Sequence, residues 1–77
     1  MFHHNGALPE GHVSEQRVLA LIAKLPARQK ICVTLRYLED FGYPDIARMV
    51  GCSEASVRAN VYQAIRKLRR ELEQEKI

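Results

Sequence analysis

The sequence has few of the features that mark an enzyme or a membrane protein. Its 77 residues contain no glycine-rich phosphate loop and no Ser/His/Asp order of the kind used in nucleophilic catalysis. No apolar run approaches the length of a membrane span, and the N-terminus lacks a signal-peptide pattern. We therefore expect a cytoplasmic protein that is not an enzyme.

Cysteine and histidine are scarce, and their spacing does not suggest a metal site. Cys32 and Cys52 form no CxxC pair and have no histidines at zinc-ligand spacing. His3, His4 and His12 all fall in an N-terminal stretch that contains glycine and proline but no apolar periodicity. We expect two reduced thiols in or near the core, no metal and no cofactor.

Length and charge distribution indicate one small domain with a basic helix. We predict a flexible lead-in or linker over residues 1–13 and a folded domain over residues 14–77. The net charge is only +3, but five basic residues and no acidic one lie between Arg58 and Arg70. Basic charge gathered on one predicted helix favours a nucleic-acid partner.

Helical periodicity predicts the fold class. Apolar residues recur at helical spacing over residues 15–24, 27–39, 44–50 and 54–75. Residues that start or stop helices stand at the ends of these segments: Ser14, Pro26, Pro44, Gly51 and Ser53. We predict an all-α fold, a compact bundle of about four helices that contains a helix-turn-helix, in the winged-helix-like DNA-binding class without a wing.

The same spacing predicts which side chains are buried. In the fourth helix the stripe comprises Val57, Val61, Ala64, Leu68 and Leu72. In the first helix the apolar face comprises Val18, Leu19, Leu21, Ile22 and Leu25, and in the second Ile31, Leu35 and Leu38 with Cys32 alongside. In the loop before the third helix, we expect Gly42 to supply backbone freedom and Phe41 or Tyr43 to fill the core.

The helix-turn-helix is predicted at about residues 44–68. Its turn is the three-residue stretch Gly51–Ser53, the turn length of the DNA-binding motif whose second helix enters the major groove. On a helical wheel, the face of the second helix away from the buried stripe carries arginines, one tyrosine and small residues. With Arg48 on the supporting helix, this predicts a DNA contact set of Ser53, Glu54, Ala55, Ser56, Arg58, Ala59, Tyr62, Arg66 and Arg48.

Several segments, in this order and spacing, resemble region 4 of bacterial RNA polymerase sigma factors, most closely the extracytoplasmic-function (ECF) type. They are Leu25–Gln29, Leu35–Tyr43, Asp45–Ala47, Gly51–Glu54 and Val57–Arg58. The resemblance extends over about Val18–Leu72. It implies a promoter-recognition module that binds the −35 element as a monomer and docks on the flap of the polymerase β subunit in transcription initiation.

The resemblance also implies roles for particular positions. The DNA-contacting positions of the family fall on Ser53, Glu54, Ser56, Arg58, Ala59 and Tyr62, with contacts to the DNA backbone near Arg48 and Arg66. The flap-binding surface would use apolar and basic residues of the first two helices. An anti-sigma factor is a further partner that the resemblance allows.

The sequence departs from the family in two respects. Asn60 and Ile65 stand where the family often has basic residues, so the basic face is thinner and the promoter sequence is not implied. Region 2, which melts the −10 element in the family, has no counterpart here. We expect either a domain cut from a longer factor or a stand-alone sigma-like regulator.

The sequence is also compatible with two other classes of protein. A LuxR/GerE-type transcriptional regulator shares four helices and a similar Ile-Ala…Gly-x-Ser…Val pattern, but would dimerise on a palindrome. A protein-interaction module held by an anti-sigma factor would use Ile65, Leu68 and Leu72 as a docking strip and would not bind DNA by itself.

Overall fold

The structure is a computed structural model that describes residues 14–74, and every element in that range is helical. In chain order the elements are α1 (Glu15–Ala23), α2 (Ala27–Val33), the π-helical segment η1 (Thr34–Leu38), α3 (Tyr43–Val50) and α4 (Glu54–Gln74). The prediction of an all-α fold is confirmed. The predicted lead-in, residues 1–13, lies outside the described residues.

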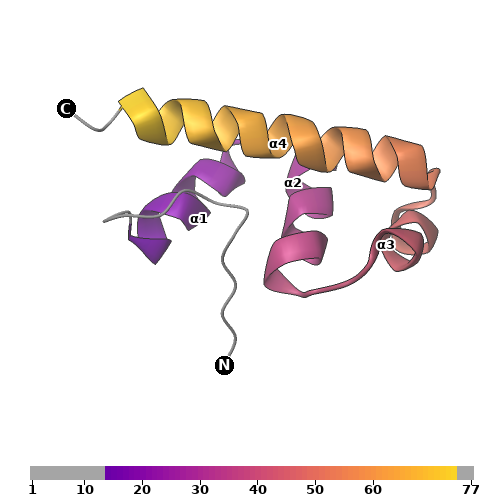
Figure 1. Ribbon diagram of the computed structural model, residues 1–77. Coiled ribbons are helices and arrows are strands. Elements are labelled where there is room, and N and C mark those ends of the chain that lie inside the picture. Colours follow the sequence, from indigo (N-terminus) through magenta and orange to yellow (C-terminus); the bar gives the residue numbers. More distant parts are fainter. Residues whose placement is uncertain (1–13, 75–77) are drawn as a thin grey trace.

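The longest helix, α4, is the one against which the others pack. In Figure 1 it runs along one side of the molecule, with α1 toward its C-terminal end, α2 near its middle and α3 at its N-terminal end. Its predicted apolar stripe is buried at every position: Val57, Val61, Ala64, Leu68 and Leu72. Apolar residues three or four positions apart share one helix face, so this single face serves all three neighbours.

The core consists of two clusters along α4. Leu21, Ile22 and Leu25 meet Val33 and the C-terminal half of the α4 stripe, Ala64, Leu68 and Leu72. Cys32 meets Ile46 and Ala47 of α3 and the N-terminal half of the stripe, Val57 and Val61. The partly buried side chains of Tyr37 and Ile65 pack against both clusters and join them.

The first helix forms as predicted. The Oγ of Ser14 accepts a hydrogen bond from the Arg17 N–H at 3.1 Å, which satisfies one of the free donors of the first turn. Leu21, Ile22 and Leu25 are buried and Val18 is partly buried, whereas Leu19 is exposed. The apolar face is therefore narrower than the sequence suggested.

The predicted buried face of the second helix is partly right, since Cys32 is buried and Leu35 packs against the core, but it is wrong at Ile31 and Leu38. Cys32 and Val33 are buried, while Ile31 is 44% exposed and Leu38 is 40% exposed. Small side chains let α4 approach this face closely, so Cys32 and Val33 occupy the contact. The next segment of the chain is η1, in which the Glu39 N–H donates a hydrogen bond to the Thr34 carbonyl, five residues earlier. The extra residue in this wider turn carries Leu38 out of the stripe.

The loop into α3 also differs from expectation. Its left-handed residue is Asp40, at φ 68, whereas Gly42 has an extended backbone at φ −81. Aspartate tolerates the left-handed region better than most residues with a side chain. Tyr43 packs against the core, while Phe41 is exposed. The corner is therefore filled by the aromatic residue on α3, and glycine is not required for the turn.

Candidate nucleic-acid interface

The turn between α3 and α4 has the predicted geometry. Gly51 is left-handed, at φ 83 and ψ 40, and its N–H donates to the Ala47 carbonyl at 2.8 Å. The Cys52 N–H donates to the same oxygen at 3.1 Å, so the end of α3 is closed by two bonds. The Oγ of Ser53 accepts from the Ser56 N–H at 3.0 Å and caps α4. These contacts fix the direction in which α4 leaves the turn.

Packing behind the turn holds α4 against α3. Ile46 and Val57 are fully buried, and Val61 is 3% exposed. A buried face at these positions leaves the opposite face of the first turns of α4 in solvent. The first turns of α4, which would enter a groove, are thus supported by α3.

The predicted contact residues lie on α3, in the turn after it and on α4. Ser56 is half-buried, and the Asn60 Nδ2 donates to its carbonyl at 2.9 Å. The other eight are exposed: Arg48, Ser53, Glu54, Ala55, Arg58, Ala59, Tyr62 and Arg66. Among the described residues, Tyr62 is the most exposed of the large apolar or aromatic side chains, at 64%. A face with two alanines between longer polar side chains lets a helix come near base edges.

Two of the cations on this face already have carboxylate neighbours. Arg58 lies 3.8 Å from Glu54, one turn before it, and Arg48 pairs with Asp45. Ion pairs on an exposed surface contribute little to stability, about 1 kcal/mol or less. A phosphate group can therefore replace the carboxylate at modest cost. On the same face, the guanidinium of Arg66 lies 5.8 Å from the Tyr62 ring centroid.

One arrangement beside this face was not found by reasoning from sequence. Two guanidinium groups lie over the Tyr43 ring, with the Arg36 Cζ at 4.7 Å and the Arg58 Cζ at 4.8 Å from its centroid. These residues come from η1, α3 and α4. Sequence spacing within one element cannot reveal such a stack, and the turn of η1 that carries Arg36 was not predicted.

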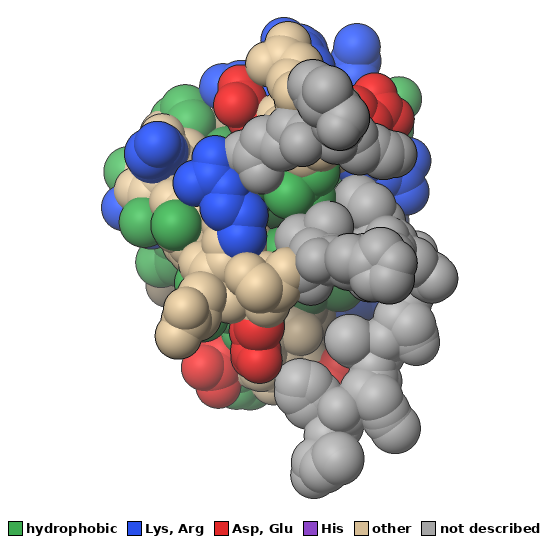
Figure 2. All heavy atoms as spheres, turned by 90° about the vertical axis from the view of Figure 1, so that its left-hand side faces the viewer, with side chains coloured by type: hydrophobic (Ala, Val, Ile, Leu, Met, Phe, Trp, Pro, Cys, Tyr) green, Lys and Arg blue, Asp and Glu red, His purple; other side chains and the backbone are tan. Residues whose placement is uncertain are grey.

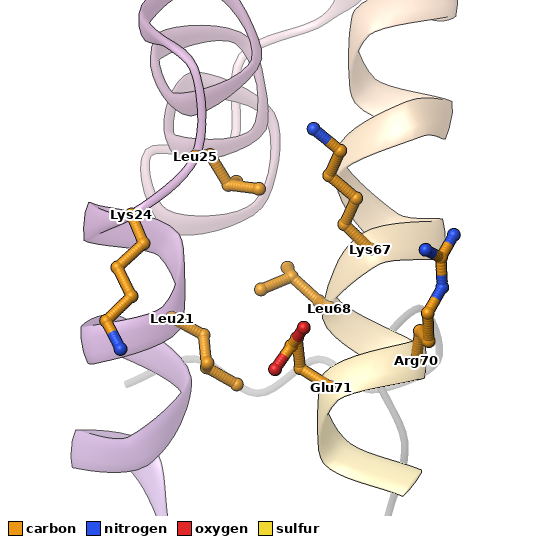
Figure 3. Close-up of a pocket in the computed structure, with 7 residues that line it drawn as sticks. All are labelled: Leu21, Lys24, Leu25, Lys67, Leu68, Arg70 and Glu71. Carbon is orange, nitrogen blue, oxygen red and sulfur yellow. The ribbon is translucent and has the colours of Figure 1, made fainter. Parts of the chain in front are cut away.

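A hollow of about 420 Å³ lies at the other end of α4. Figure 3 shows Leu21, Leu25 and Leu68 pointing into the space between α1 and α4. Four charged side chains complete the lining: Lys24, Lys67, Arg70 and Glu71. Figure 2 looks onto this end of the molecule and shows basic side chains beside exposed hydrophobic ones. The lining comes from α1, the two residues after it and α4, and no residue of α2 is part of it.

The buried cysteine has an altered acidity. Burial raises the pKa of the Cys32 thiol, and the nearby Cys52 thiol raises it further, while Arg28 has a smaller opposing effect. Both cysteines are free thiols, Cys32 buried and Cys52 half-buried. A raised pKa keeps the Cys32 thiol protonated and unreactive.

The described residues contain neither a cluster of metal ligands nor a membrane-spanning helix. Among residues 14–74, no three or more His, Cys, Asp or Glu side chains come together where they could hold a metal ion. His3, His4 and His12 lie outside the described residues. In the part of the chain that the structure describes, no helix is both long and apolar enough to cross a membrane.

Comparison with known proteins finds similarity to sigma factors of RNA polymerase. The family model described as sigma-70, region 4, matches residues 15–68. The ECF RNA polymerase sigma factor BldN of Streptomyces coelicolor is 33% identical over 58 residues, which are 75% of this chain and 22% of that protein. The RNA polymerase sigma factor FliA of Yersinia enterocolitica is 36% identical over 73 residues, 90% of this chain and 32% of that protein. The chain thus spans less than a third of the length of each relative, and no solved structure matches it.

Proposed function

The chain belongs to the sigma-70 region 4 family, and from that premise we propose that it recognises the −35 element of a bacterial promoter in transcription initiation. The observation that carries this proposal is the capped turn from Gly51 to Ser53, which presents an exposed α4 face supported by α3. This is the arrangement with which a helix-turn-helix enters the major groove. The proposed activity is binding, without a catalytic step, in the cytoplasm where the polymerase works.

The residues of this interface have different proposed roles. The start of α4 lies nearest the bases, where Arg58 can make a bidentate bond to guanine and Glu54 can accept from the cytosine amino group. The hydroxyl of Ser53 and the free N–H groups of the first turn favour a phosphate. Further from the turn, Tyr62, Arg66 and Arg48 suit the DNA backbone, which sets position more than sequence. Ala55, Ser56 and Ala59 have short side chains, so they allow α4 to approach the bases closely.

The test begins by finding the DNA sequence, because the chain does not reveal it. Selection from a library of randomised duplexes with the 77-residue chain should enrich one asymmetric motif. Fluorescence anisotropy should then give tighter binding to the selected duplex than to a scrambled one of equal length, by about a thousandfold or more at physiological salt. No enrichment, or equal affinity for both duplexes, would refute sequence-specific recognition.

We also propose that the hollow between α1 and α4 docks on the flap of the polymerase β subunit. Leu21, Leu25 and Leu68 on its floor are already buried in the core, so a partner would meet mainly the rim, where Lys24 and Lys67 favour acidic groups. The domain over residues 14–77 would then bind DNA at one end of α4 and polymerase at the other. Because the chain spans only part of its relatives, melting of the promoter would need a further module.

The docking proposal has a charge-reversal test. Lys24→Glu combined with Lys67→Glu should weaken binding to the isolated β flap at least tenfold in calorimetry, because both rim charges become repulsive toward an acidic partner. Arg58→Ala, at the other end of α4, is the matched control and should bind the flap as the unaltered chain does. Equal flap affinity in all three proteins would place the docking surface elsewhere.

A further inference from the structure

The stack of Arg36, Tyr43 and Arg58 joins three elements beside the proposed DNA face. The Tyr43 ring is half-buried and packs against the cluster that contains Ile46 and Val57, so its position is set by the core. A cation within about 6 Å of a ring centroid is attracted to the face of the ring. Both guanidinium groups meet that distance, at 4.7 Å and 4.8 Å.

Arg36 supports the ring from the side of η1. Its Nη1 donates to the Phe41 carbonyl at 3.2 Å, and its guanidinium also lies 5.8 Å from the Tyr37 ring. Its Nε is buried without a hydrogen-bond partner. A buried, unpaired donor is costly, and the contacts of Arg36 with the Tyr43 ring and the Phe41 carbonyl offset this cost and hold the side chain in place. Tyr43 is therefore a fixed platform between the loop and α4.

Arg58 contacts the protein through its guanidinium group, while much of its side chain remains open to solvent. Its side chain is 59% exposed, and its neighbours on the protein are the Tyr43 ring and the Glu54 carboxylate. An arginine without such contacts samples many rotamers and loses that freedom when it binds a ligand. A guanidinium that is already stacked loses less when DNA arrives.

We propose that Tyr43 is a positioning residue that holds the Arg58 guanidinium in place for DNA. The proposal rests on the proposed function, in which Arg58 is a DNA contact. Tyr43 acts on DNA affinity through Arg58, and Arg36 acts by fixing the ring. The π-helical turn of η1 has a role in this arrangement, because it places Arg36 beside the loop that precedes α3.

The first test is a double-mutant cycle on the selected duplex. Tyr43→Leu, which removes the ring, should weaken binding about two- to fivefold, while Tyr43→Phe, which retains it, should bind as the unaltered chain does. In an Arg58→Ala background the Tyr43→Leu change should have no further effect. If Tyr43→Leu weakens DNA binding equally in the presence of Arg58 and in the Arg58→Ala background, the proposal is overturned. Tyr43 would then act through the stability of the fold and not through Arg58.

The second test needs no DNA and separates this proposal from the proposed function. NMR relaxation of the Arg58 Nε–H group in the free protein should show greater mobility in Tyr43→Leu than in Tyr43→Phe. Equal mobility in the two variants would overturn the positioning role. A third outcome is that Tyr43→Leu makes the Arg58 side chain more mobile while Arg58→Ala leaves DNA affinity unchanged. In that case Arg58 is not a DNA contact, and the role of Tyr43 in DNA binding is overturned as well.

Discussion

Arg58 illustrates how a single side chain combines charge with a fixed position. It is exposed on α4, yet it contacts both Glu54 and the Tyr43 ring. The guanidinium therefore has one side on the protein and the other toward solvent. This is the arrangement expected of a side chain that reads a base edge or a phosphate without first being ordered.

Arg58→Ala should weaken binding to the selected duplex by about 1–3 kcal/mol and leave the fold intact. Anisotropy gives the affinity, and circular dichroism checks the helix content. Lys24→Ala is the matched control, because it removes one positive charge at the α1 end of the molecule and should change affinity far less. Unchanged binding by Arg58→Ala with native dichroism would show that the DNA face is assigned wrongly.

The acidity of Cys32 predicts a pH dependence of stability. Its pKa is raised above the ordinary value of 9.0, mainly by burial. Above about pH 9 the unfolded chain therefore binds fewer protons at this thiol than the folded chain, so the free energy of unfolding falls as pH rises. Urea unfolding at about pH 8 and about pH 10 should show this fall, and Cys32→Ala should reduce its size. An identical fall in Cys32→Ala would assign the effect to other groups.

At the scale of elements, the turn between α3 and α4 depends on backbone sterics. Gly51 adopts φ 83, and a Cβ added there would meet nothing within 4 Å. The need for glycine therefore comes from the left-handed backbone and not from crowding. The neighbouring loop shows the contrast, because Gly42 has an ordinary backbone and a Cβ there would lie 3.6 Å from the Pro44 Cδ.

Gly51→Ala should lower the free energy of unfolding by about 1–2 kcal/mol, the cost of a left-handed residue with a Cβ. Gly42→Ala is the matched control and should be neutral or slightly stabilising, because it restricts the unfolded chain without straining the folded one. Urea unfolding of the two variants gives the comparison. Equal destabilisation would mean that the left-handed turn is not the reason for glycine at position 51.

The buried stripe of α4 can be tested with two adjacent positions. Val61 is 3% exposed and Tyr62 is 64% exposed. Val61→Asp should unfold the domain, since an unpaired buried carboxylate costs several kcal/mol and a domain of this size has about 5 kcal/mol of stability. Tyr62→Asp, which adds the same carboxylate on the outer face, should melt near the temperature of the unaltered chain. A Val61→Asp protein that melts normally would refute the assigned stripe.

At the scale of the molecule, α4 connects two surfaces of different character. One end carries the exposed arginines with Tyr62, and the other borders the hollow with Leu21 and Leu68. The length of α4, 21 residues, separates the two surfaces, so in the proposed function DNA and the polymerase flap would not compete. Membership of the region 4 family favours this assignment over the LuxR/GerE-type alternative, in which the last helix would mediate dimerisation.

The salt dependence of DNA binding tests the charge distribution of the whole molecule. If Arg48 and Arg66, the proposed backbone contacts, each neutralise one phosphate, the logarithm of the binding constant should fall against the logarithm of salt concentration with a slope of about −2. Arg66→Ala should reduce the slope by about one. Sedimentation should find one chain per duplex. A flat salt dependence would support the protein-interaction module, and two chains on a palindrome would support a dimeric regulator.

Local chemistry explains which features were predictable. The stripe from Val57 to Leu72 was predicted at every position, because apolar residues at helical spacing on a long helix admit one buried face. The turn at Gly51 and the caps at Ser14 and Ser53 were predicted because they depend on neighbouring backbone groups alone. Family membership followed from the order of such segments along the chain.

The tertiary structure decided what depends on residues far apart in sequence. The buried face of α2 centres on Cys32 and Val33, because contact with α4 selects the side chains that allow close approach, and the predicted Ile31 and Leu38 are exposed. The left-handed residue at Asp40, the hollow between α1 and α4 and the stack on Tyr43 each require elements to be placed in space. The sequence by itself determined the helices, the turn and the exposed face of α4. Only packing determined how Arg58 is held there, because the ring that holds it comes from another helix.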